Sequence, residues 1–199
     1  MKNMLNIIKS RLTSGEDLVL VTVIASSGAT PRGAGARMLV GKEGRICGTI
    51  GGGTVEYRSE QIAARVLEEQ TSLGHDFTLT KDDVQNLGMI CGGACSVFFH
   101  HIPAGDEHTI VLCEKAEAQF RQGSALWLLT CLGENGRMGL YAPELGYWGM
   151  DVSEPLPLSR HPERIGEIFA EQIHAPGKVY VFGGGHVAQE LVPVLSHVG

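Results

Sequence analysis

The sequence has no long apolar run, which excludes a membrane-spanning segment of the usual kind. Across its 199 residues, no uninterrupted apolar stretch approaches the roughly 20 residues that a spanning helix needs. The amino-terminal segment "MKNMLNIIKSRLTSGED" mixes charged and apolar residues and lacks the continuous apolar region and small-residue cleavage site of a secretory signal. We therefore expect a cytoplasmic protein that does not bind membranes.

Positive charge and cysteine are also scarce. Lys and Arg total 16 against 22 Asp and Glu, a net charge of −6, so no general binding of nucleic acid is expected. The five cysteines are an odd number, and in the cytoplasm they should be mostly reduced. Cys91 and Cys95 form one CxxxC pair without the second close pair of a strong zinc signature, so we predict no metal site. A disulfide between these two cysteines under oxidation stays open as an alternative.

Glycine is the residue in excess. The 27 glycines stand singly or in short groups without a repeating period, which excludes a collagen-like chain. With 43% hydrophobic residues, the chain can bury roughly two-thirds of its unfolded surface, enough for a core. Helical and strand-like apolar spacings occur in mixed order, and the fold class expected is therefore α/β.

Local patterns predict the individual elements. Helices are expected up to Gly15, over 54–70 with Thr54 as the N-cap, and over 163–174. Strands are expected over 17–26, 95–102 and 108–115. Two hairpins are expected to turn at 42–44 and at 134–136.

A concentration of prolines after Ala142 suggests a division of the chain. We expect an α+β domain over 1–141, a proline-rich linker over 142–176, and the first strand, glycine turn and helix of a Rossmann-like doubly wound domain over 177–199. The segment from Lys178 to Gly199 has 22 residues, fewer than the roughly 30 of one βαβ unit. It cannot close such a sheet by itself.

The first candidate binding motif is "GTIGGGTVE", in which Gly51, Gly52 and Gly53 join a strand to a helix. Backbone N–H groups at such a helix start attract a phosphate or another oxyanion. Glu56, in the first turn, already satisfies the helix dipole and would repel an anion unless it reaches outward to a ligand's N–H donors. The alternative is that these glycines only allow close packing of strand and helix.

Two further motifs have the composition of binding loops. Arg32 lies in "ATPRGAGARM", where small neighbours leave a guanidinium free to contact a phosphate, although such an arginine can also be merely solvated. In "LGMICGGACSV", Gly92 and Gly93 would let a ligand approach Cys91, a soft sulfur donor or reactive thiolate. A glycine turn with a small buried cysteine is the alternative.

The last motif is "VYVFGGGHVA", in which Gly183, Gly185 and Ala188 have the GxGxxA spacing of a dinucleotide-binding turn. His186 stands among the first helical N–H groups, where it could contact a phosphate. The acidic residue that completes this pattern would lie about 20 residues further on, beyond Gly199. Glycines used only for strand–helix packing are the alternative.

Taken in order, "GATPRGAGARMLV", "GTIGGGTVE", "LGMICGGACSV" and "VYVFGGGHVA" resemble the XdhC/CoxI family of molybdenum-hydroxylase accessory proteins over Leu18–Gly199. The resemblance implies a bacterial cytoplasmic chaperone that binds the molybdenum cofactor (molybdopterin), protects it during sulfuration and delivers it to xanthine dehydrogenase or a related molybdenum hydroxylase. It also implies a family-specific domain followed by a Rossmann domain, a cysteine desulfurase-type sulfur donor, and a homodimer.

The resemblance implicates matching residues in cofactor binding: Arg32, Gly51, Gly52, Gly53, Glu56, Cys91, Gly92, Gly93, Gly183, Gly185 and His186. Thr54 departs from the family pattern, which commonly has Cys or His at this place. Two other functions remain as rivals: a nicotinamide-dependent oxidoreductase using NAD(P) at the GxGxxA turn, and a protein-docking domain without a ligand.

Overall fold

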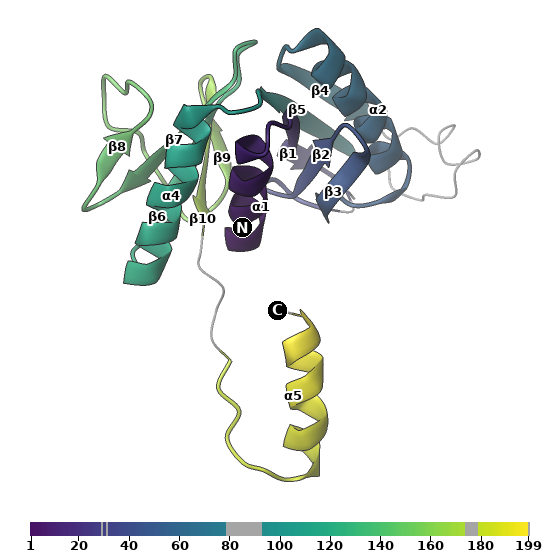
Figure 1. Cartoon of the computed structure of the whole chain (residues 1–199), viewed down its shortest axis with the longest axis vertical. Coiled ribbons are helices and arrows are strands. Elements are labelled where there is room, and N and C mark those ends of the chain that lie inside the picture. The colour runs from purple at the N-terminus through teal and green to yellow at the C-terminus, as the bar shows by residue number, and fades with distance from the viewer. Residues whose placement is uncertain (29, 31, 79–92, 174–178, 199) are drawn as a thin grey trace.

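Two five-stranded antiparallel sheets form most of the protein, seen in a computed structural model (Figure 1). The structure describes residues 1–28, 30, 32–78, 93–173 and 179–198, with only the backbone for 197 and 198. The first sheet has the order β3-β2-β1-β5-β4 and the second β8-β7-β6-β10-β9. The first sheet's strands are β1 Leu18–Ser27, β2 Arg37–Gly41, β3 Gly44–Thr49, β4 Leu73–Thr78 and β5 Ala94–Ile102. The second sheet's strands are β6 Leu126–Cys131, β7 Arg137–Ala142, β8 Gly146–Trp148, β9 Glu163–Ile165 and β10 Ile168–Ile173.

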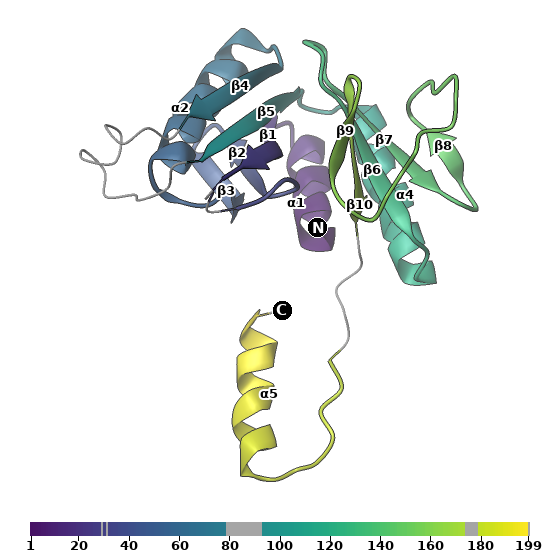
Figure 2. The same cartoon turned by 180° about the vertical axis from the view of Figure 1, so that it is seen from behind.

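Helices pack on both faces of the first sheet. The four described helices are α1 Lys2–Thr13, α2 Gly53–Glu69, α4 Glu107–Gln122 and α5 His186–Val198. Helix α2 covers one face of the first sheet, while α1 lies between that sheet and the second one, beside α4 (Figure 2). Buried side chains of α1, α4 and both sheets therefore form one shared core.

Strand β1 is apolar along most of its length because both of its faces are covered. Leu18 and Leu20 belong to the core shared with α1 and α4, whereas Val19, Val21 and Val23 pack in the core under α2. Successive side chains of a strand point to opposite faces, so a continuous apolar run fits a strand enclosed on both sides. The core therefore requires the uninterrupted sequence "LVLV".

Several predicted elements are confirmed, including the first helix, the strand over 17–26, the helix over 54–70, the strand over 95–102 and both hairpins. The mixed α/β class is confirmed as well. Thr54 is not the N-cap of α2, because that position belongs to Gly52, which has φ +76° and no side-chain cap.

The strand predicted over 108–115 is wrong, because these residues belong to α4. Asp106 is the N-cap, and its carboxylate accepts a hydrogen bond from the Thr109 backbone N–H at 3.0 Å. Leu112, Ala116 and Phe120 then lie four residues apart and are buried on one side of the helix. The capping carboxylate and this spacing outweigh the strand-favouring run "TIVL".

The helix predicted over 163–174 is also wrong, because β9 and β10 form a hairpin there. Gly166, with φ +60°, supplies the turn between the two strands, and Phe169 packs into a small cluster with Ile24 and Phe98 of the first sheet. The expected linker over 142–176 therefore contains β8, β9 and β10 of the second sheet. The outer limits of the three expected units remain predictions.

The carboxy-terminal segment lies apart from the two sheets (Figure 1). Helix α5 begins at His186, directly after the predicted glycine turn. The strand expected before it is not seen in the described residues 179–182. Among all described helices, none has the length and apolar character required to cross a membrane.

Candidate functional site

One end of the first sheet brings together three of the sequence-predicted loops. Arg37, at the start of β2, pairs with Thr49, at the end of β3, so the loops before and after them leave the sheet side by side. Ser27, at the end of β1, pairs with Ala94, at the start of β5. This end, here called the glycine end, carries Arg32, Gly51, Gly52, Gly53 and Gly93.

Glu56 holds the glycine loop between β3 and α2. Its Oε2 accepts hydrogen bonds from the backbone N–H groups of Ile50 at 3.0 Å and Gly52 at 3.1 Å, and from the Thr49 hydroxyl. The side chain is about 10% exposed and turns inward rather than toward solvent. The Gly52 N–H group, which the sequence analysis offered to an external anion, is thus already bound to an internal carboxylate, as is the neighbouring N–H group of Ile50.

The charge of Glu56 is stabilised in this position. Burial alone raises the pKa of a carboxyl group, but here hydrogen bonds from Thr49, Gly52 and Ile50, with the nearby Arg45 guanidinium, outweigh it and hold the pKa of Glu56 below its usual value. Arg45 forms an ion pair with Glu56 and lies 3.6 Å from Glu60. Glu56 therefore serves as an ionised anchor of the loop at neutral pH.

The other predicted residues at the glycine end differ in accessibility. The Arg32 side chain is exposed, Gly51 and Gly52 are half-buried, Gly53 is exposed and Gly93 is buried. Cys91 and Gly92 lie outside the described residues, so their predicted roles remain predictions. Cys95 is a free thiol, and burial, with Asp76 nearby, raises its pKa, which makes it the less reactive kind of cysteine.

A buried ion pair beside the glycine end was missed because its partners are 134 positions apart, from 37 to 171. The guanidinium of Arg37 in β2 contacts the carboxylate of Glu171 in β10, and both side chains are 6% exposed. Burial lowers the pKa of Arg37 to about 9, which leaves it charged at neutral pH. No local pattern marks Glu171, since an acidic residue in a strand usually faces solvent.

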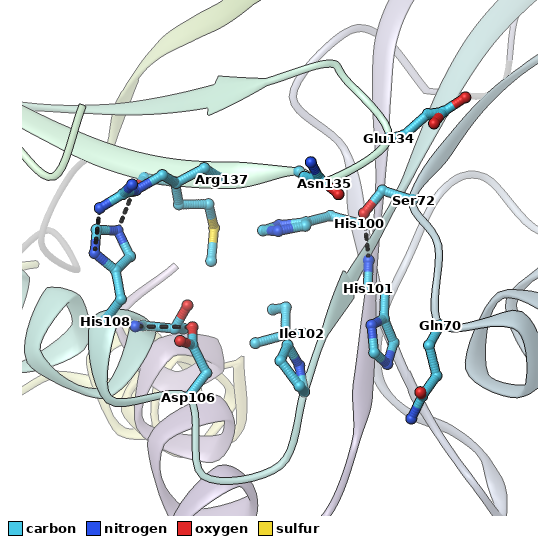
Figure 3. A pocket seen from close by; sticks show the side chains of 14 residues that line it. Gln70, Ser72, His100, His101, Ile102, Asp106, His108, Glu134, Asn135 and Arg137 are labelled. Atoms are coloured by element: carbon cyan, nitrogen blue, oxygen red, sulfur yellow. Dashed lines mark hydrogen bonds between the residues drawn. The ribbon is translucent and has the colours of Figure 1, made fainter. Parts of the chain in front are cut away.

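A second feature that the sequence does not reveal is a polar cavity of about 470 Å³ between the two sheets (Figure 3). It is lined by His100 and His101 of β5, by the turn of the β6–β7 hairpin around Gly136, and by Asp106 and His108 at the start of α4. The adjacent histidines point to opposite sides of β5, as expected for neighbours in a strand.

The cavity histidines are largely held by the protein itself. His108 Nε2 donates to the Met138 carbonyl at 2.7 Å, and the ring stacks on Trp148. The backbone N–H of His101 donates to Ser72 Oγ at 3.0 Å. The side-chain Nε2 of His101 lies 3.8 Å from Asp17 Oδ2. Within the described residues, no group of three or more His, Cys, Asp or Glu side chains could hold a metal ion.

His100 is the most strongly perturbed histidine of this cavity. Burial lowers its pKa to about 4, while a backbone hydrogen bond at Gly136 and the charge of Asp106 act in the opposite direction. Its Nδ1 is buried and has no hydrogen-bond partner among the described residues. Burial between the sheets therefore favours the neutral imidazole at this position.

The structure does not bring the carboxy-terminal motif to the glycine end. Gly183, Gly185 and His186 are all exposed in the segment that Figure 1 shows apart from the sheets. Gly183 has φ +106°, a conformation that favours glycine. Their predicted role in nucleotide or cofactor binding remains a prediction.

Comparison with known proteins relates the amino-terminal part of the chain to one family. The model of the XdhC and CoxI family matches residues 11–78, which run from the end of α1 to the end of β4. Over these residues the chain resembles the XdhC and CoxI family. The match contains Arg32, Gly51–Gly53 and Glu56, whereas Cys91–Gly93 and Gly183–His186 lie beyond it.

Among curated proteins, the chain resembles two relatives whose names refer to molybdenum hydroxylases or their cofactor. It is 25% identical to a probable xanthine dehydrogenase subunit from Bacillus subtilis, over 93% of this chain and 58% of that protein. It is 28% identical to the molybdenum cofactor insertion chaperone PaoD of Escherichia coli, over 64% of this chain and 41% of that protein. The chain therefore spans about half the length of these relatives.

A solved structure supports the fold. The crystal structure of a protein described as a xanthine dehydrogenase from Bacillus halodurans matches with a TM-score of 0.65 and 20% identity, over 86% of this chain and 52% of that one. At this identity the likeness establishes the arrangement of strands and helices and nothing about activity.

Proposed function

We propose that this protein is an accessory factor in the maturation of a xanthine dehydrogenase-type molybdoenzyme, and that it binds the molybdenum cofactor at the glycine end. The observation that carries the proposal is the family match over 11–78, because it contains Arg32 and the Glu56-anchored glycine loop. The resemblance to PaoD, a molybdenum cofactor insertion chaperone, supports the same role.

At the glycine end, Arg32 is available to the cofactor's terminal phosphate, whereas the N–H groups of Ile50 and Gly52 are not. The N–H groups of Ile50 and Gly52 donate to Glu56, so a phosphate cannot use them while this carboxylate is ionised. Arg32 is exposed at the same end and is suited to contact a phosphate through its guanidinium. We therefore assign the phosphate contact to Arg32 and the shaping of the loop to Glu56.

The remaining parts of the proposal include Cys91 and Gly92, which lie outside the described residues. Cys91 would supply a thiolate to the soft, oxidation-sensitive molybdenum–sulfur centre that the cofactor carries, with Gly92 and Gly93 leaving room for its approach. Assistance in sulfuration by a cysteine desulfurase-type donor, delivery to the hydroxylase, and a homodimer belong to the same proposal and follow from the family resemblance.

The experiment that tests this function is equilibrium binding of anaerobically prepared molybdenum cofactor to the 199-residue chain. We expect saturable binding that weakens in the Cys91→Ala and Arg32→Ala variants and is insensitive to excess NADH. Unchanged affinity in Cys91→Ala would remove the thiolate from the proposal. No binding by the wild-type chain would overturn the glycine end as the cofactor site.

A nicotinamide-dependent oxidoreductase is the second candidate, because the glycine turn before α5 has the GxGxxA spacing. The comparisons give NAD(P) no support, and the same titration with NADH as the only ligand tests it directly. Saturable NADH binding that is lost in Gly185→Val would favour this candidate.

A further inference from the structure

Residues 34–36, which connect the Arg32 loop to β2 and are here called the stem, lie against the second sheet. Gly35 has φ +89°, and a Cβ built on it would lie 3.1 Å from Glu171 Oε2 and 3.1 Å from Pro162 Cγ. The backbone N–H of Gly35 donates to the Val23 carbonyl at 2.8 Å, which fixes the other side of the stem to β1. Glycine is favoured here, because a φ of +89° strains any side chain and a Cβ would press on both neighbours.

Arg37 connects this stem to the same carboxylate. Its guanidinium donates through Nη1 to the Gly35 carbonyl at 3.4 Å and meets Glu171 through Nη2. Ala34 packs against the cluster of Ile24, Phe98 and Phe169, and Phe169 precedes Glu171 by two residues in β10. Residues 34–37 are therefore held by one strand of the second sheet as well as by their own sheet.

Stability alone does not explain this pair. Removing two charges from water costs several kcal/mol per ion, and such a pair is often no more stabilising than apolar residues of similar volume. Arg37 Nε has no hydrogen-bond partner within the described residues, so the desolvation of this guanidinium is incompletely offset. A buried ion pair does, however, fix one geometry, because its charges tolerate few alternative arrangements.

We propose that Glu171 is a positioning residue, which holds Arg37 and the backbone of residues 34–36 so that Arg32 is presented at the glycine end. This rests on the proposed function for the identity of the ligand, an anionic group of the cofactor. The second sheet thereby takes part in a site whose proposed phosphate-binding residue, Arg32, lies in a loop of the first sheet.

Limited trypsin digestion reports the loop position without any ligand. The protease cleaves after Arg32 only when the backbone around it opens, so the cleavage rate at the Arg32–Gly33 bond measures how firmly the stem is held. In Glu171→Gln, which keeps the side-chain shape, we expect this rate to rise about tenfold, the effect of roughly 1.4 kcal/mol on a local opening equilibrium. The matched control is Glu167→Gln, in the same hairpin, which removes an exposed ion pair with Arg164 and should leave the rate unchanged.

A double variant separates positioning from stability. Arg37→Met with Glu171→Leu replaces the pair by apolar side chains and should retain or raise the urea midpoint, while cleavage after Arg32 stays fast. Two results would overturn the positioning role. One is a cleavage rate that changes only in proportion to the urea midpoint in both Glu171→Gln and the double variant. The other is an unchanged cleavage rate in Glu171→Gln.

Cofactor titrations keep the two proposals apart. We expect Glu171→Gln to lower cofactor affinity about as much as Arg32→Ala does, and Glu167→Gln to leave it unchanged. Faster cleavage in Glu171→Gln, together with no cofactor binding by the wild-type chain, would overturn the proposed ligand and retain the positioning. Normal affinity despite faster cleavage would overturn the link between Glu171 and the presentation of Arg32.

Discussion

Glu56 Oε2 accepts a hydrogen bond from the backbone N–H of Gly52 at 3.1 Å, so a carboxylate of α2 binds the loop that precedes this helix. The bond places a negative charge at the positive end of the helix dipole, where an external oxyanion would otherwise be attracted. The glycine loop is therefore held by an internal carboxylate, and in our proposal the exposed Arg32 contacts the anionic ligand.

Glu56→Gln should destabilise the protein by about 1–3 kcal/mol, because charge-assisted bonds to Thr49, Ile50 and Gly52 become weaker neutral ones. Urea denaturation at pH 7 measures this loss. The pKa of Glu56 is lowered in the folded protein, so its contribution is complete above the unfolded pKa and disappears as pH falls through the folded one. The variant and the wild type should therefore converge in acid. Glu60→Gln, on the same helix and near the same Arg45, is the control and should change stability little.

Gly136→Ala should destabilise by about 3 kcal/mol, because a Cβ there would lie 2.6 Å from Ser72 Oγ and 2.9 Å from His100 Nε2. Gly146→Ala is the matched control, since Gly146 also has positive φ (+67°) but nothing lies within 4 Å of its Cβ position. The control should cost about 1–2 kcal/mol, from backbone strain alone. Thermal and urea unfolding compare the two, and equal losses would contradict close packing between the sheets at Gly136.

His100 should make the protein less stable as pH falls from about 6.5 to about 4. Its pKa is lowered to about 4 by burial, so over this interval the unfolded chain binds the proton more readily than the folded one. The difference between the unfolded and folded pKa values of His100 corresponds to a loss of about 3 kcal/mol in the free energy of unfolding across this pH interval. In His100→Gln this part of the pH dependence should disappear, as measured by urea unfolding at several pH values. An unchanged slope would rule out His100 as the source of this pH dependence.

Arg32→Ala should weaken cofactor binding about tenfold or more, the effect of losing one charge-assisted contact to phosphate. Arg65→Ala removes the same charge from an exposed position on α2 and should leave the affinity unchanged. Both variants should unfold at the wild-type midpoint, because neither side chain is buried. Equal affinities in the two variants would place the phosphate contact elsewhere.

Elements with a strong local pattern could be predicted from the sequence, while those with competing signals could not. The period-four spacing of Ile62 and Val66 predicted α2, and Asn135-Gly136 predicted the turn between β6 and β7. By contrast, "TIVL" in α4 favours a strand locally. The Asp106 N-cap and the buried side chains of Leu112, Ala116 and Phe120 stabilise a helix instead. Over 163–174, the turn at Gly166 and the pairing of β10 with β6 decided against a helix.

The sequence by itself determined the family resemblance, the mixed α/β class and the identity of the polar loops, because these depend on residues that are near one another in the chain. Only the tertiary structure decided that Glu56 turns inward to the glycine loop and that Glu171 meets Arg37 across two sheets. The direction of a side chain, and a contact between distant positions, depend on how strands and helices pack. The chemistry offered at the glycine end is therefore set by packing as much as by the residues that compose it.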